Sequence, residues 1–243
     1  YFCSTMEKQK VVFRDLGSME YKAAWDYQEV LLQENLQVKK VQVGEGTTAN
    51  FELSTQNYLL FVEHSPVYTL GKSGKMENVL ISEEDREEKG IGFFQTNRGG
   101  DITFHGPGQI VGYPILDLEK FYTDIGRYLR ELEEVIILTL AEYGITAGRS
   151  AGETGVWIDA GVKGSERKIC AMGVRCSRWI TMHGFALNVN TDLSYFGHII
   201  PCGIQNKKVT SIKEELGREG DITDVKEKLK RNFEKVFKAE IRV

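Results

Sequence analysis

The sequence predicts one α+β domain, because its strand-like and helix-like segments do not alternate strictly along the 243 residues. Three segments place apolar residues at helical spacing, and the apolar runs between them have the length of strands. Hydrophobic residues make up 41% of the chain and charged residues 27%, which is sufficient for a sizeable core. No repeat, low-complexity tract or linker divides the sequence. We therefore expect a single domain over residues 11–243. Residues 1–10 are treated as an N-terminal extension, since Met6 is an alternative start.

The first half predicts one long helix and several short strands. After Gly17, Ser18 can cap a helix that continues to about Val38. The apolar stripe of this helix is expected to contain Ala23, Tyr27, Val30, Leu31 and Leu36. The other expected elements are a strand at Val11–Arg14, a polar turn region at Gly44–Asn50, strands at Tyr58–Glu63 and Val67–Leu70, and a surface loop or short helix between Gly71 and Lys89.

The second half predicts a helix, three strands and two further helices. The first helix begins at Thr123 or Asp124 and ends at Gly144, and its apolar residues lie on one face. In the strand Lys168–Arg175 polar and apolar residues alternate only partly, which is typical of a strand that is covered on both faces of the sheet. The remaining expected elements are strands at Gly155–Asp159, Lys168–Arg175 and Thr181–Val189, a short helix with the capping box Ser211 to Glu214 that ends at Gly217, and a last amphipathic helix from Thr223 through Ala239.

Composition and spacing exclude several classes of function. The net charge of −4 lacks the basic excess of a typical nucleic-acid-binding protein. The four cysteines and four histidines are scattered, so we expect no metal site. No apolar run approaches the ~20 residues of a membrane span, and we expect no membrane partner. Without a secretory signal, the cysteines indicate reduced thiols in a cytoplasmic protein.

A glycine-rich segment between two apolar runs, Ile91–Phe94 and Ile110–Ile115, is the strongest functional signal. Its glycines and proline rule out a regular helix and allow the backbone to approach a ligand closely. We interpret the segment as a strand that ends in a ligand-contacting loop; the alternative is a glycine-rich turn with polar side chains of no function. The expected contact residues here are Arg98, Gly99, Gly100, Asp101, Ile102, Thr103, Phe104 and His105.

Cys202 is the candidate nucleophile, because Pro201 and Gly203 fix a turn around it and basic residues follow. The alternative is a small buried hydrophobe, which fits Cys170 and Cys176 better because both lie in strand-like sequence. Lys168 begins an apolar strand. Taken alone, a lysine at this position is what a solvent-exposed strand end would have without any function. His183 is either a structural or a catalytic histidine.

These residues together resemble a known family, the lipoyl(octanoyl) transferases of lipoate biosynthesis. The pattern Arg98-Gly99-Gly100-x-x-Thr103-x-His105-Gly106-Pro107-Gly108-Gln109, followed by Tyr113-Pro114-Ile115, is similar to the family signature. Residues 63–71, 168–175, 183–188 and 201–204 match further motifs in the family's order and spacing. The similarity covers the chain from about Val11 to the last helix. One departure is Cys170, where the family usually has a small residue such as Ala.

The resemblance implies a mixed β-sheet with packed helices, as in the catalytic domain of biotin and lipoate ligases. It implies transfer of an octanoyl (or lipoyl) group from acyl carrier protein to a lysine of lipoyl-domain proteins, through a thioester on Cys202 with Lys168 as its partner. The acceptors would be lipoyl domains of 2-oxoacid dehydrogenase complexes and the glycine cleavage H protein. No cofactor is implied. Further contacts to the acyl group would come from Ala171, Met172, Gly173, Gly184, Phe185 and Ala186.

The chemistry of the residues agrees with this activity, since a thiolate divides acyl transfer to an amine into two easier steps. Small residues at Ala171, Gly173, Gly184 and Ala186 are expected to line a slot for the acyl chain. Two alternatives remain: an ATP-dependent ligase of the lipoate or biotin type, and a non-catalytic relative that binds the carrier protein. Because acyl carrier proteins are acidic, we also expect a basic docking face. Its candidate residues are Arg175, Arg178, Lys207, Lys208 and Lys213.

Overall fold

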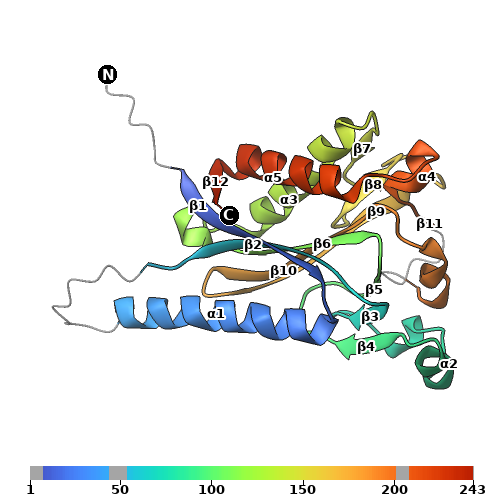
Figure 1. The fold of residues 1–243 in the computed structure, drawn as a ribbon, viewed down its shortest axis with the longest axis horizontal. Coiled ribbons are helices and arrows are strands. Elements are labelled where there is room, and N and C mark those ends of the chain that lie inside the picture. The colour runs from blue at the N-terminus through green and yellow to red at the C-terminus, as the bar shows by residue number, and fades with distance from the viewer. Residues whose placement is uncertain (1–7, 44–53, 201–207, 243) are drawn as a thin grey trace.

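The computed structural model describes residues 8–43, 54–200 and 208–242. Cys202, Lys207 and the predicted turn region Gly44–Asn50 lie outside these ranges. In the described part, one large sheet lies between two helical layers (Figure 1). Helix α1 (Tyr21–Val43) covers one face, and α3 (Ile125–Ala141) and α5 (Ile222–Phe237) cover the other. The structure is therefore α+β with a mixed sheet, as the sequence predicts.

The large sheet has nine strands among the described residues. Strand β1 is parallel to its neighbours β12 and β2, and β11 is parallel to β9, whereas all other pairs are antiparallel. In spatial order the strands are β12 (Ala239–Arg242), β1 (Gln9–Ser18), β2 (Asn57–Glu63), β6 (Gln109–Ile115), β10 (Ile180–Asn188), β9 (Arg167–Ser177), β8 (Val156–Ile158) and β7 (Ala147–Gly148), with β11 (Lys208–Val209) also beside β9.

A second sheet of three strands lies at one end of the molecule. Its order is β4 (Gly92–Gln95), β3 (Val67–Leu70) and β5 (Ile102–His105). Three short helices lie beside this small sheet: η1 (Met76–Asn78), α2 (Glu83–Glu88) and η3 (Leu193–His198). A fourth, η2 (Leu118–Lys120), follows β6 of the large sheet. The glycine-rich segment therefore contains a strand, β5, with a loop on each side.

Two helix starts have the predicted capping residues, whereas the predicted cap of the first helix is wrong, because Ser18 ends β1 and α1 begins at Tyr21. The Asp124 side chain accepts a hydrogen bond from the backbone N–H of Arg127 at the start of α3 (2.9 Å). Ser211 caps α4 (Ile212–Leu216), and Gly217 ends it in the left-handed conformation. The prediction that the last helix includes Ala239 is wrong. Lys238 adopts a left-handed conformation that ends α5, and Ala239 opens β12.

The predicted apolar stripe of the first helix is wrong in part, because Ala23 and Val30 are exposed. The face of α1 that packs on β6 and β10 contains Leu31, Leu32 and Leu36, but it also contains buried polar residues such as Gln28. A pattern built on apolar residues alone cannot locate such a face. Tyr21, the first residue of α1, lines the cavity described next.

Candidate active site

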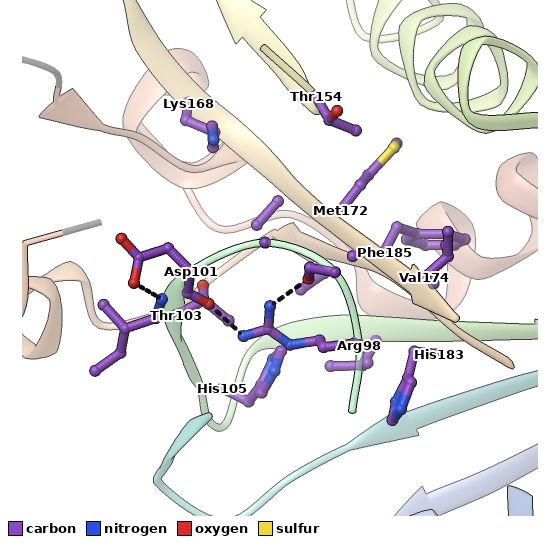
Figure 2. A pocket seen from close by; sticks show the side chains of 18 of the residues that line it. Arg98, Asp101, Thr103, His105, Thr154, Lys168, Met172, Val174, His183 and Phe185 are labelled. Atoms are coloured by element: carbon purple, nitrogen blue, oxygen red, sulfur yellow. Dashed lines mark hydrogen bonds between the residues drawn. The ribbon is translucent and has the colours of Figure 1, made fainter. Parts of the chain in front are cut away.

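A cavity of about 590 Å³ lies where the two sheets meet, and its lining comes mainly from β5, β6, β9 and β10, the loop before β5 and the start of α1. Of the predicted contact residues, Phe104 lies elsewhere, stacked on Tyr195 in the core of the small sheet (centroids 4.5 Å apart). Strand alternation turns Phe104 away from the side that Thr103 and His105 face. Figure 2 shows the residues around the cavity. The predicted residues that line it are Arg98, Gly99, Gly100, Asp101, Ile102, Thr103, His105, Lys168, Ala171, Met172, Gly173, Gly184, Phe185 and Ala186.

Arg98 holds the glycine-rich loop in place. Its guanidinium donates to the backbone oxygens of Thr69 (2.6 Å), Asp101 (2.9 Å) and Gly99 (3.0 Å) and to Thr69 Oγ1 (2.9 Å). Only 7% of Arg98 is exposed. A guanidinium has five N–H donors in a rigid plane, so it can bind several backbone carbonyls at once. These hydrogen bonds of Arg98 are called the Arg98 clamp. Sequence reasoning expected a ligand contact from Arg98; the structure shows that much of its hydrogen-bonding capacity serves the loop itself.

The glycines at the cavity allow backbones to approach each other. A Cβ on Gly184 would lie 2.2 Å from the carbonyl oxygen of Gly112, and one on Gly173 would lie 2.6 Å from that of Gly99. Real Cβ atoms do not come this close to an oxygen, so both positions require glycine. Both glycines line the cavity together with Ala171 and Ala186, and that these four residues hold an acyl chain stays a prediction.

A chain of buried side-chain hydrogen bonds runs along one side of the cavity. Gln109 Nε2 donates to Asn188 Oδ1 (2.9 Å), and Asn188 Nδ2 donates to the carbonyl of Thr210 (3.0 Å). Gln109 Oε1 therefore accepts from His105 Nδ1–H (2.8 Å), and Thr69 Oγ1 lies 3.3 Å from His105 Nε2. Burial lowers the pKa of His105 well below its usual value. The imidazole is thus neutral and fixed in orientation.

Sequence reasoning missed Tyr21 and Tyr113, which form the inner wall of the cavity with His105, and His64, which lies behind Tyr113. His64 Nδ1–H donates to the carbonyl of Met19 (2.8 Å), so its Nε2 accepts from the hydroxyl of Tyr113 (2.7 Å). Tyr21 stacks on His105 with ring centroids 5.9 Å apart. Burial lowers the pKa of His64 to about 4 and raises that of Tyr21 to about 12. The wall is therefore uncharged at neutral pH.

Lys168 lies at the opposite end of the cavity, between β8 and β11. Its register partners are Trp157 in β8 and Val209 in β11, and its Nζ is 4.5 Å from the centroid of the Trp157 ring. Figure 2 shows the side chain at one end of β9, away from His105 and His183. Lys168 is thus a cavity residue, and its strand is flanked by neighbours on both sides.

Both described ends of the chain around Cys202 reach this cavity. Before it, Ile200 N–H donates to the carbonyl of Asn78 (2.8 Å), and Asn78 Nδ2 donates to the cavity residue Asp101 (2.7 Å). After it, Lys208 begins β11, which pairs with β9 at Lys168. Cys202 itself lies outside the described residues, so its distance from Lys168 stays a prediction.

Cys170 and Cys176, the two cysteines that the sequence analysis assigned to buried strands, lie among the described residues. Cys170 is fully buried in the core between the sheet and α3, and burial raises its pKa. Cys176 is half-buried, and burial raises its pKa as well. Neither environment favours a thiolate.

The described candidate basic residues are spread over the length of β9 and the segments beside it. Arg178 follows the end of β9 that is opposite Lys168, and the eleven residues of β9 span about 33 Å. Arg175 is engaged by Glu29 (2.6 Å), and Lys213 is paired with Glu219 (3.1 Å). Of the described four, Lys208 lies in β11 opposite Arg167, the residue before Lys168. That these residues form one docking face stays a prediction.

Comparison with solved structures defines the class of fold. The chain superposes on a bipartite lipoate protein ligase from Thermoplasma acidophilum with a TM-score of 0.65, 16% identity, and coverage of 98% of this chain and 86% of the ligase. A lipoate-bound protein from P. falciparum gives a TM-score of 0.67 at 13% identity, covering 96% and 65% of the two chains. The fold is that of lipoate ligases. The structure describes no helix with the length and apolarity of a membrane span, and no cluster of three or more His, Cys, Asp or Glu suited to a metal ion.

Sequence relatives define the family. The model of the lipoyl protein ligase A/B catalytic domain matches residues 20–234, and the chain belongs to this family. A Christiangramia forsetii protein named octanoyltransferase is 58% identical over 96% of this chain and 98% of its own. One of the same name from Flavobacterium johnsoniae is 59% identical over 96% and 99%. Like these relatives, the protein is an acyltransferase enzyme.

Proposed function

We propose that this enzyme moves an octanoyl group from acyl carrier protein to a lysine of lipoyl domains, through a thioester on Cys202. The acceptors would be the lipoyl domains of 2-oxoacid dehydrogenase complexes and the glycine cleavage H protein, in the cytoplasm. The observation that carries the proposal is the place of Lys168. It lines the cavity and pairs with β11, the strand that begins six residues after Cys202. The names of the curated relatives support the eight-carbon acyl group.

In the first step, Lys168 stabilises the thiolate of Cys202 as an ammonium. The thiolate attacks the carbonyl carbon of the donor thioester, and the bond from this carbon to the carrier's sulfur breaks. The departing sulfur takes a proton from the Lys168 ammonium. The products are octanoyl-Cys202, the free carrier thiol and a neutral Lys168.

In the second step, the neutral amine of the acceptor lysine attacks the thioester carbon on Cys202. A C–N bond forms, the C–S bond breaks, and the proton lost from the amine nitrogen goes to Lys168. This restores the thiolate and ammonium pair. Lysine suits both steps because its amine can lose a proton when desolvated, whereas a guanidinium cannot.

The test is intact-protein mass spectrometry after mixing with octanoyl-acyl carrier protein in the absence of ATP. We expect one octanoyl adduct that Cys202→Ala abolishes and that a lipoyl domain removes. Cys176→Ala is the matched control and should retain the adduct. An adduct on Cys170 or Cys176 would move the nucleophile. Acyl transfer that needs ATP, with no adduct, would instead indicate a ligase.

A further inference from the structure

His183 occupies an unusual position in the wall of the cavity. It is 1% exposed, lies in the middle of β10, and has a backbone φ of +57°. Residues other than glycine rarely adopt this conformation, which is strained and persists only where surrounding contacts impose it. The backbone N–H of His183 donates to Gln28 Oε1 of α1 (2.9 Å). The strained conformation is therefore held from the helix side.

The ring of His183 holds Asn97 from the other side. Asn97 Nδ2 donates to Glu29 Oε1 (3.2 Å), so Asn97 Oδ1 is the atom that faces the ring. The 2.8 Å contact between Asn97 Oδ1 and His183 Nε2 then requires a proton on Nε2. Nδ1 has no hydrogen-bond partner among the described residues. Burial, with the nearby charges of Arg98 and Arg175, lowers the pKa of His183 to about 3, which keeps the ring neutral.

Asn97 directly precedes the loop 98–101 that lines the cavity. A second contact holds this loop to the same pair of strands. Gly99 N–H donates to the carbonyl of Val174 (2.9 Å), and Val174 is the cross-strand partner of His183. Glu29 also accepts from Arg175 of β9 (2.6 Å). Helix α1, β9, β10 and the loop are thus joined at one point by buried or half-buried hydrogen bonds.

We infer that His183 is a positioning residue, which through Asn97 fixes the height of loop 98–101 above the sheet and so limits the acyl chains that fit. The cavity space over Gly173 depends on this height, because a Cβ on Gly173 would lie 2.6 Å from the carbonyl of Gly99 and 3.2 Å from Arg98 Cδ. A loop that rises would admit a longer or bulkier chain. The dependence on acyl chains rests on the proposed function; the dependence of the loop on His183 does not.

The test compares His183→Asn and Asn97→Ala with the wild-type enzyme. Asparagine tolerates a positive φ but is shorter than histidine, so His183→Asn removes the ring and retains the backbone. For both variants we expect the ratio of kcat/KM for octanoyl-carrier to that for decanoyl-carrier to fall by about fivefold or more. The double variant should fall no further. Arg178→Asn is the matched control, because Arg178 also has a positive φ (+47°) but lies exposed in the β9–β10 turn. Its ratio should remain at the wild-type value.

A second measurement does not depend on turnover. Hydrogen–deuterium exchange over residues 97–101 should become faster in both variants, and ¹⁵N shifts should show His183 as the neutral Nε2–H tautomer in the wild type. The inference is overturned if either the acyl preference or the exchange stays at the wild-type level in both variants. A wild-type enzyme that transfers no octanoyl group would contradict the proposed function, and exchange alone would then decide whether His183 holds the loop.

Discussion

The hydroxyl of Tyr113 donates a 2.7 Å hydrogen bond to Nε2 of His64, directly behind the wall that Tyr113 forms in the cavity. This pair joins β6 to the residue that follows β2, and both rings are almost fully buried. The bond fixes the tautomer of His64, because Nδ1–H is already used by the carbonyl of Met19. A second proton on Nε2 would force the Tyr113 hydroxyl to accept instead of donate, and its buried O–H would lose this acceptor.

Acid should weaken the fold through His64. Its pKa is about 4 in the folded protein against 6.5 unperturbed. Between these pH values the unfolded chain binds a proton that the folded protein does not, so the free energy of unfolding falls as the pH drops. The loss from this residue amounts to about 3 kcal/mol and is complete below about pH 4. Urea unfolding from pH 7 to pH 4 measures it.

His64→Gln should make stability fall less steeply with acid, by the one proton that His64 takes up, although it lowers stability at pH 7. His105 and His183, whose pKa values burial also lowers, retain their share of the fall. The partly exposed His198 provides the control, and His198→Gln should leave the fall unchanged. A fall of equal slope in His64→Gln and the wild type would show that other groups cause it.

Tyr113→Phe should destabilise the fold at neutral pH. The substitution keeps the ring but leaves Nε2 of His64 as a buried acceptor without a donor, at a cost of about 1–3 kcal/mol. Tyr58→Phe, on the adjacent strand β2, is the control because Tyr58 is only half-buried. Thermal and urea denaturation measure both. Equal stability of the two variants would contradict the value given to the hydrogen bond.

Local patterns in the sequence predict α3, α5 and the inner strands, because amphipathic spacing and capping residues act within one segment. They do not predict β7, β11 or β12, since these short strands exist only through partners far along the chain. Ala239 was placed in a helix for this reason. The buried Gln28 of α1 shows the same limit, since its role depends on His183, 155 residues away.

For the site, the sequence motifs predict the residues around the cavity better than their roles. A run of eight contact residues, Arg98 to His105, includes a strand whose side chains alternate, so Phe104 turns to the other face. In the Arg98 clamp, Arg98 holds its loop through a hydrogen bond to the carbonyl of Thr69, 29 residues away. The inner wall is supported by the hydrogen bond between Tyr113 and His64, 49 residues apart. Such long-range pairs leave no local signal in a single sequence.

Gly184→Ala should disrupt the sheet at the cavity. A methyl group there would lie 2.2 Å from the carbonyl oxygen of Gly112 and 2.6 Å from Pro114 Cδ, so β10 and β6 would have to separate. We expect a loss of roughly 2–4 kcal/mol in the free energy of unfolding, as for other overpacked positions. Gly197→Ala is the control, because nothing lies within 4 Å of a Cβ at that site. A Gly184→Ala protein as stable as Gly197→Ala would refute the close approach.

Lys168→Arg should separate the two steps of the proposed reaction. Arginine retains a positive charge at the strand that pairs with β11 and so preserves part of the thiolate stabilisation, but it cannot accept the proton of the acceptor amine. We expect slow formation of octanoyl-Cys202 and little onward transfer, so that the acyl-enzyme accumulates. Lys168→Ala should slow both steps, by about 10²-fold or more, as for loss of a general base. Quenched-flow mass spectrometry of the acyl-enzyme, with and without a lipoyl domain, measures each step. Lys163→Ala, in an exposed turn, is the control and should behave as wild type. Rapid onward transfer by Lys168→Arg would show that another group takes the proton.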